Sequence, residues 1–305
     1  MLKRILVAIP IIIVVALALF VQGWVLAIFA VALACMSQFE VVRAMDGNGK
    51  PVIKTTSFLF SGVLAVLFLI DACSGISGAE FEVAVYTPAV VIALFVAFAI
   101  VTFVISMFSK KHHAESVSNT FLTFIYPQLF FVLFYALILG TGLSSEAGAW
   151  GIMAENDVYM GLLTMLLMVF LPAMFCDTFA YFFGMAFGKR KLCPSISPKK
   201  TVAGSVAGIA GGILAAFLIW LVFGKLVSIG GHIAEMKPVW NYMIAGAILA
   251  VISQFGDLSA SYLKRALGIK DFGKLLPGHG GIVDRVDSVM FCIPVVFILS
   301  MMAII

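Results

Sequence analysis

The chain has 305 residues, of which 63% are hydrophobic and 11% charged, and its formal net charge is +4. A soluble domain carries about 25% charged residues, so this chain has too few polar groups to cover a surface in water, and a soluble globular protein is excluded. Lipid must surround most of the chain, and in lipid only helices or a closed barrel pair every backbone polar group.

Nine apolar runs follow one another and predict an all-α, polytopic integral membrane protein with about nine transmembrane helices. The runs are ~17–25 residues long, the length of a membrane-spanning helix, and they lack the alternation of barrel strands. The first run follows a basic start without a signal-peptide cleavage site and is predicted to be retained, with a re-entrant hairpin of the first two runs as the alternative. The predicted spans are 5–21, 23–43, 56–74, 88–108, 119–142, 158–185, 203–225, 239–263 and 286–304.

The basic residues collect in alternate segments between these spans. Every Lys and Arg except Lys225 and Lys237 falls on one side of the predicted membrane. Because positive residues accumulate on the cytoplasmic side, the amino terminus is predicted to be cytoplasmic and the carboxyl terminus outside. We divide the chain into an N-terminal region, 1–118, with about four spans, and a catalytic region, 119–305, with cytoplasmic loops at 186–202 and 264–285.

The sixth span carries an acid, Asp177, in an otherwise apolar helix. Such a carboxylate is costly in lipid unless it is paired or functional, so a metal or nucleotide role and a hydrogen bond between helices both stay open. The next cytoplasmic loop places Ser197, Lys199, Lys200 and Thr201 just before a helix. This combination suits a triphosphate, and loop charge with a helix N-cap is the alternative.

Three more acids lie around the last cytoplasmic loop. Asp257 ends an apolar helix, where a salt bridge is the alternative to a functional role, and Asp284 and Asp287 share one face of the last helix. Between them, the glycine-rich stretch 277–281 can present backbone N–H groups to phosphate. Its His279 suits acid–base chemistry or phosphate binding, or is a plain surface histidine. Three carboxylates at one depth, amid basic residues, suit Mg²⁺.

The run 261–287 resembles the signature of the phosphatidate cytidylyltransferase (CDP-diacylglycerol synthase) family. That signature reads S-x-x-K-R, four residues, K-D-x-G, a hydrophobic residue with P-G-H-G-G, one hydrophobic residue, and x-D-R-x-D, and the run fills it without a gap. The resemblance extends upstream through 256–258, 197–201 and 177–178. Ala260 departs from it, since many relatives carry Glu there.

The resemblance implies transfer of the cytidylyl group of CTP to phosphatidate, which gives CDP-diacylglycerol and pyrophosphate for phospholipid biosynthesis. It implies Mg²⁺ as cofactor, associates K⁺ with the same centre, and places metal ligation on Asp257, Asp284 and Asp287, with Asp177 as a further candidate. The expected catalytic residues are Lys264, Arg265, Lys270, Asp271, His279 and Arg285. The expected substrate-binding residues are Ser197, Lys199, Lys200, Thr201, Ser261, Gly280 and Gly281.

The expected partners are CTP, phosphatidate and membrane lipids, without nucleic acid, and a homodimer is expected from the resemblance alone. A bacterial inner membrane with the active site facing the cytoplasm is the expected location. Another nucleotide-dependent membrane lipid enzyme is the nearest alternative. A transporter is a more distant one, because intramembrane acids occur there too but near the midplane rather than at one face.

Overall fold

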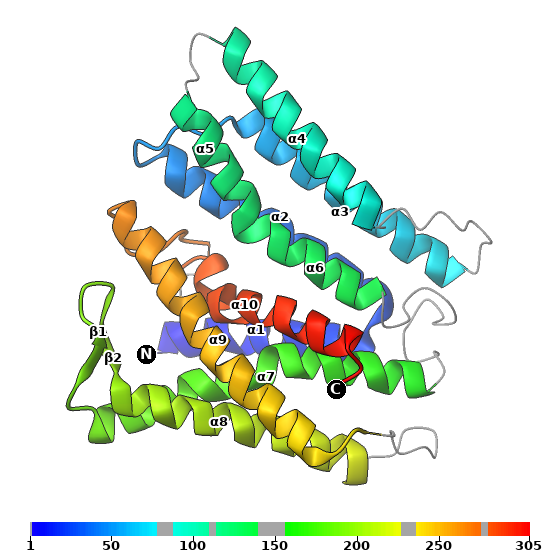
Figure 1. The fold of residues 1–305 in the computed structure, drawn as a ribbon, viewed down its shortest axis with the longest axis vertical. Helices are drawn as coiled ribbons and strands as arrows, with labels where there is room; N and C mark the ends of the chain where they lie inside the picture. The colour runs from blue at the N-terminus through cyan, green and yellow to red at the C-terminus, as the bar shows by residue number, and fades with distance from the viewer. Residues whose placement is uncertain (1, 78–87, 110–113, 140–155, 227–235, 276–279) are drawn as a thin grey trace. The chain divides into compact units, whose positions relative to one another are not determined.

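The computed structural model describes residues 2–77, 88–109, 114–139, 156–226, 236–275 and 280–305, and these are almost wholly helical (Figure 1). Contacts divide the chain into two compact units. The first consists of Met1–Ala154 with Leu267–Arg285, and the second of Glu155–Ala266 with Val286–Ile305. The functional division predicted at residues 118 and 119 stays a prediction.

The first unit is built from long apolar helices and one interrupted helix. Its elements are α1 (Leu2–Val21), α2 (Gly23–Asp46), α3 (Lys54–Ser77), α4 (Pro88–Phe108), α5 (Ala114–Thr123), η1 (Phe124–Gln128) and α6 (Leu129–Ile138). The interruption falls at Tyr126, whose backbone is non-helical (φ −125°, ψ 106°) ahead of Pro127. Proline lacks an N–H and disfavours helical backbone in the residue before it, so the sequence itself explains the kink.

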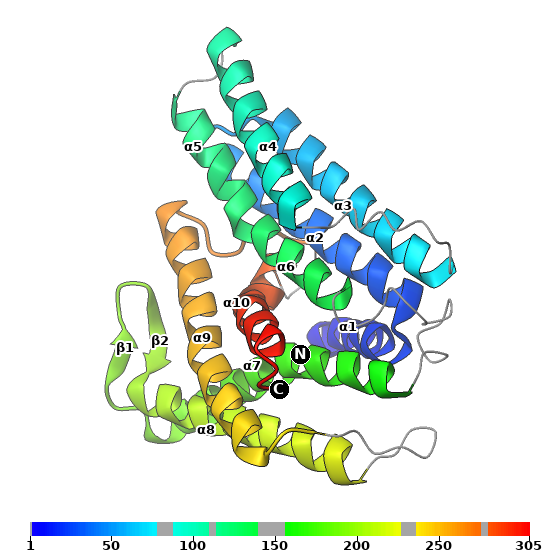
Figure 2. The same ribbon diagram turned by 45° about the vertical axis from the view of Figure 1, so that its right-hand side comes forward.

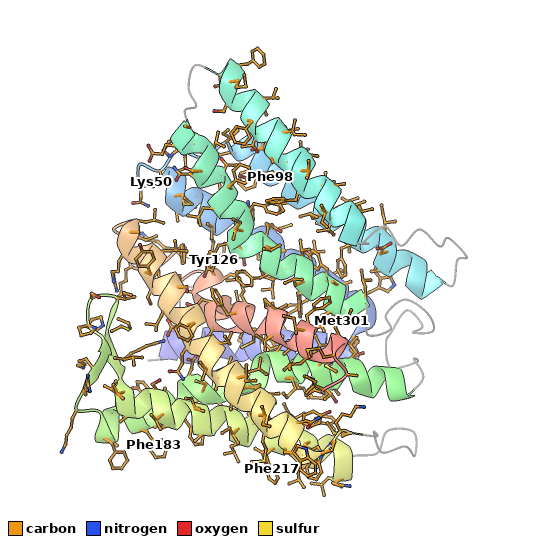
Figure 3. The ribbon with its side chains drawn as sticks, in the orientation of Figure 1. Lys50, Phe98, Tyr126, Phe183, Phe217 and Met301 are labelled. Atoms are coloured by element: carbon orange, nitrogen blue, oxygen red, sulfur yellow. The ribbon has the colours of Figure 1, made fainter. Side chains whose placement is uncertain are left out.

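Aromatic rings form much of the core of the first unit. Phe98, labelled in Figure 3, lies with its ring centroid 4.7 Å from that of Phe124 and 5.3 Å from that of Phe60. One polar contact crosses this apolar interior, because the Gln128 side-chain amide donates to Ser61 Oγ at 2.5 Å. Ring packing and this buried hydrogen bond therefore join α3, α4 and the interrupted helix.

The second unit contains a three-helix layer, a hairpin and most of the last helix. Its elements are α7 (Asn156–Phe187), β1 (Lys191–Cys193), β2 (Ser197–Thr201), α8 (Val202–Leu221), η4 (Val222–Leu226), α9 (Val239–Ala266) and α10 (Val283–Met301), whose first three residues belong to the first unit. Helices α7 and α8 run close together, and α9 crosses them at a steep angle in both ribbon views (Figures 1 and 2).

Small residues allow these helices to approach closely. A Cβ added at Gly208 of α8 would overlap Cys176 of α7, and one added at Gly212 would overlap Ala250 and the Gly246 carbonyl of α9. Stripes of small residues of this kind are common between helices in membranes, where close contact rather than water exclusion drives association. The glycines of α8 thus allow both α7 and α9 to pack closely against it.

Each of the nine predicted ranges overlaps a helix of the structure, and the range 119–142 covers the end of α5, η1 and α6. Among the described residues, seven helical segments are long and apolar enough to cross a membrane. They are α2, α3, α4, α5 through α6, α7, α8 with η4, and α9. The protein is therefore an integral membrane protein, as predicted. The count of nine spans and the orientation stay predictions, because α1 and α10 are outside this group.

One segment differs from the expected structure. The range 186–202, predicted as a loop, contains the antiparallel hairpin β1–β2, which pairs Lys191 with Thr201 and Cys193 with Ser197. Local sequence favoured a loop because Pro194 and Pro198 cannot donate backbone hydrogen bonds. The pairing nevertheless forms, and it fixes the strand that carries Lys199 and Lys200 directly ahead of α8.

Candidate active site

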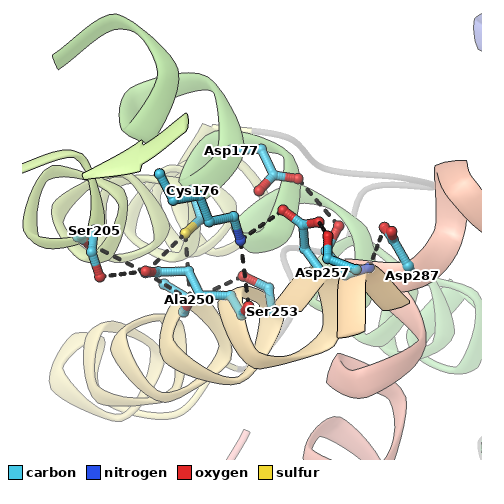
Figure 4. Close-up of polar contacts among 11 residues, drawn as sticks. Cys176, Asp177, Ser205, Ala250, Ser253, Asp257 and Asp287 are labelled. Carbon is cyan, nitrogen blue, oxygen red and sulfur yellow. Dashed lines mark hydrogen bonds and ion pairs between the residues drawn. The ribbon is translucent and has the colours of Figure 1, made fainter. Parts of the chain in front are cut away.

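Three carboxylates gather in the second unit, and we call Asp177, Asp257 and Asp287 the aspartate cluster. They come from α7, α9 and α10 (Figure 4). Ser288 links two of them, because its Oγ donates to Asp177 Oδ2 at 3.2 Å and its backbone N–H donates to Asp287 Oδ1 at 2.8 Å. A Cβ added at Gly256 would overlap the Asp287 carbonyl oxygen, so α9 and α10 touch beside Asp257.

A lysine from the hairpin lies at the edge of this cluster. Lys200 Nζ is 2.6 Å from Asp257 Oδ2, and it also donates to the Gln254 carbonyl oxygen at 3.5 Å. The two charged side chains keep 22% and 31% of their surface exposed, so an incoming ligand can reach both. An ion pair of this kind can exchange its partner for another anion, such as a phosphate, without leaving a buried charge unpaired.

A network of buried polar groups holds the helices behind the cluster (Figure 4). Ser205 Oγ donates to Gln254 Oε1, while Gln254 Nε2 donates to the Ser205 carbonyl oxygen at 3.2 Å and to Cys176 Sγ at 3.4 Å. Cys176 precedes Asp177, and Gln254 lies three residues before Asp257. The network therefore connects α7, α8 and α9 at the level of the carboxylates.

Gln254 was not among the predicted site residues. A signal was available, because an amide in an apolar run, one turn from an acid, marks the helix face that meets its neighbours. Its partners, Cys176 and Ser205, lie 78 and 49 residues away. No local pattern could have named them.

A second acidic arrangement lies in the first unit, around the glycine-rich signature. Asp284 Oδ2 accepts hydrogen bonds from the backbone N–H groups of Phe272, at 2.9 Å, and Gly281, at 3.0 Å. Gly280 adopts a positive φ of +83°, and both Asp271 and Asp284 border it. The structure thus brings together Asp271, Gly280, Gly281 and Asp284, all predicted site residues.

The other predicted residues of the second unit surround the aspartate cluster or support its elements. Ser261 Oγ donates to Asp257 Oδ1 at 3.5 Å, and half-buried Lys264 and exposed Arg265 lie in the last turn of α9. Thr201 caps α8, since its side chain accepts from the Gly204 N–H at 3.2 Å. The helix N-cap, which was the alternative interpretation of this loop, is therefore present.

The remaining predicted residues lie at several places on the two units. Ser197 is half-buried and Lys199 exposed on β2, and Lys270 and Arg285 are exposed in the first unit. His279 lies outside the described residues. Their predicted catalytic or binding roles stay predictions.

The comparisons with known proteins identify the family of this chain. A sequence model of the cytidylyltransferase family matches residues 2–303. The chain belongs to the cytidylyltransferase family. The resemblance inferred from residues 261–287 is thereby confirmed.

Several bacterial proteins named phosphatidate cytidylyltransferase are similar to this member of the cytidylyltransferase family. The protein from Staphylococcus epidermidis is 38% identical over 180 residues, which is 56% of this chain and 65% of the relative. The protein from Thermotoga maritima is 39% identical over 122 residues, 40% and 43% of the two chains, and that from Haemophilus influenzae 39% over 139 residues, 46% of each. The matched stretch thus spans less than two thirds of the length of these relatives.

The donor set of this cytidylyltransferase-family chain suits a hard cation. Within the part of the chain that the structure describes, no three His, Cys, Asp or Glu side chains are grouped so as to hold a metal ion as they stand. Mg²⁺, however, is usually bound by one or two carboxylates and completes its shell with water and substrate phosphates. The aspartate cluster fits that shared mode. Metal ligation by Asp177, Asp257, Asp284 and Asp287 stays a prediction.

Proposed function

We propose that this chain transfers the cytidylyl group of CTP to phosphatidate, giving CDP-diacylglycerol and pyrophosphate. The observation that carries the proposal is the aspartate cluster with Lys200 at its edge, in a chain of the cytidylyltransferase family. Carboxylates beside an exchangeable lysine are suited to phosphates that must be bound and released.

In the proposed reaction a phosphate oxygen of phosphatidate attacks the α-phosphorus of CTP. A new P–O bond forms, the bond between the α-phosphorus and its bridging oxygen breaks, and pyrophosphate leaves with the electron pair. The nucleophile is already anionic, so no strong base is required. Catalysis then consists of positioning and charge neutralisation.

The residues of the second unit supply both the positioning and the charge neutralisation. Lys200 exchanges Asp257 for a phosphate oxygen of CTP, and Lys264, two turns beyond Asp257 on α9, adds a second positive charge. The Gln254 network keeps α7, α8 and α9 fixed while the ion pair opens, so the carboxylates need not reorganise during the reaction.

Asp177, Asp257 and Asp287 would hold Mg²⁺. Metal ligation by Asp284, whose Oδ2 accepts two backbone N–H groups in the first unit, stays a prediction. When bound, the ion would neutralise charge on the reacting phosphates. The carboxylate donors support this assignment, and the exposure of Asp177 and Asp257 leaves room for water and phosphate, while Asp287 is buried. We assign no residues to a separate site for the predicted K⁺.

The membrane explains why the substrate is a lipid. Acyl chains of phosphatidate can stay among apolar helices while the phosphate lies at the boundary, where Lys and Arg collect. Bacterial relatives and the distribution of basic residues support a bacterial inner membrane with the site on the cytoplasmic side. The homodimer stays an expectation.

The test is a pyrophosphate-release assay with the purified protein in detergent, CTP and phosphatidate. We expect release only when both substrates are present, no release with ATP, and loss of activity on chelation of divalent cations. Release without phosphatidate, or equal release with ATP, would instead assign the chain to another nucleotide-dependent reaction.

A further inference from the structure

A buried glutamate outside the predicted site contacts the signature. Glu40, near the end of α2, is only 4% exposed, and its Oε2 accepts a hydrogen bond from the backbone N–H of Val283 at 3.0 Å. The two residues are 243 positions apart in the chain. Both belong to the first unit.

The same carboxylate lies between the two described segments of the glycine-rich signature, 271–275 and 280–283, which we call the loop arms. A Cβ added at Gly273, in the first arm, or at Gly281, in the second, would overlap the carboxylate of Glu40. Only glycine leaves room for the carboxylate at these two positions. Glu40 therefore touches both arms at once.

The start of α10 gives this contact a physical reason. The first N–H groups of a helix have no partner within the helix, and a negative charge near them is favourable. Val283 is the first residue of α10, so Glu40 acts as an N-cap supplied by a different helix. Asp284, the next residue, binds backbone N–H groups of both arms.

Burial of this acid needs compensation. Its Oε1 has no hydrogen-bond partner among the described residues, and a buried carboxylate without full pairing is costly. A glutamine could accept the same N–H bond through its carbonyl oxygen. Among the described residues, the backbone N–H of Val283 in the second arm offsets part of this cost.

We propose that Glu40 is a positioning residue of the signature. Its carboxylate holds the two arms together, so that Asp271 and Asp284 border Gly280 and the arm amides keep one arrangement. The effect on activity rests on the proposed cytidylyl transfer. The effect on the arms does not.

The test uses hydrogen exchange of the full chain in detergent, followed by mass spectrometry of peptides that cover the arms. In Glu40→Leu we expect exchange in the arms to rise by about tenfold or more, since a hydrogen bond to a charged group is lost. Glu40→Gln keeps an acceptor and is expected to restore slow exchange. Glu40→Asp, one methylene shorter, is expected to exchange fast.

The matched control is Gln38→Leu. Gln38 is also a buried polar residue of α2, at 0% exposure, and both its amide atoms lack hydrogen-bond partners among the described residues. We expect it to leave exchange in the arms unchanged. Fast exchange in Gln38→Leu, or unchanged exchange in Glu40→Leu, would overturn the proposal.

A double variant separates positioning from general damage. Gly273→Ala crowds the Glu40 carboxylate, so Gly273→Ala with Glu40→Asp should exchange more slowly in the arms than the sum of the two single effects. Simple additivity would contradict direct contact. If arm exchange behaves as expected but no variant, nor the wild type, forms CDP-diacylglycerol, the proposed function fails while the positioning role stands.

Discussion

The two acidic regions of this protein contain the same chemical group, a carboxylate, with different kinds of partner. In the second unit, Asp177 and Asp257 are bound by side chains, from Ser288 and Lys200, and Asp287 accepts only from the N–H of its neighbour on the same helix among the hydrogen bonds described above. In the first unit, Glu40 and Asp284 are bound by backbone N–H groups of the signature. One region can exchange its partners for a ligand, and the other holds a loop in shape.

From this difference we infer the role of each carboxylate from its partner rather than from its position in a motif. A lysine ammonium can move to a phosphate, since its stem is flexible. A backbone N–H cannot move without moving the chain. We therefore expect chemistry to depend most on the aspartate cluster, and conformation to depend most on the residues bound to backbone.

The largest effect is expected from Asp257→Asn, which should lower kcat by about 100-fold or more because a carboxylate proposed to hold Mg²⁺ at the reacting phosphates is lost. The matched control is Asp46→Asn. Asp46 makes an ion pair of the same length, 2.6 Å, with Lys54, at a site outside the cluster. Pyrophosphate release under saturating substrates measures both, and equal losses in the two variants would abolish the distinction between the regions.

A smaller loss is expected from Lys200→Met, with kcat/KM for CTP falling by about tenfold or more, as for loss of a charge-assisted hydrogen bond. Its neighbour Lys199 is exposed on the same strand, so Lys199→Met should change this ratio little. Initial rates over a range of CTP concentrations test the pair. The reverse order would place the other face of the hairpin toward the nucleotide.

Helix packing provides the next contrast between the units. A Cβ at Gly212 of α8 would overlap α9, whereas a Cβ at Gly62 of α3 would meet nothing within 4 Å. Gly212→Ala should therefore destabilise the fold by about 1–3 kcal/mol. Gly62→Ala should be neutral or stabilise it by about 0.5–1 kcal/mol. Thermal unfolding in detergent measures both, and a stable Gly212→Ala variant would argue against the close approach of α8 and α9.

The smallest effect is expected at the cap of α8. Thr201→Val removes the acceptor for the Gly204 N–H and should cost about 1 kcal/mol, while Thr201→Ser should keep most of that contribution. The same unfolding assay applies. A rise in KM for CTP without loss of stability would return Thr201 to the nucleotide site predicted from its sequence context.

Much of the fold follows from the sequence alone, for a local reason. Each apolar run must pair its own backbone groups in lipid, so length and hydropathy determine where helices lie. The placement of Asp284 and Asp287 three residues apart on α10 is likewise a property of one helix. The signature of residues 261–287 indicated the family directly.

Tertiary structure decided the rest, because the partners lie far apart in the chain. The hairpin formed despite two prolines and delivered Lys200 to Asp257, 57 residues away by their numbers. Gln254 found its partners on two other helices, and Glu40 reached Val283. The sequence alone determined which segments are helical and which family the chain resembles. Only packing determined which acids pair with a lysine and which accept backbone N–H groups, because these partners are distant in the chain and meet only when the helices pack.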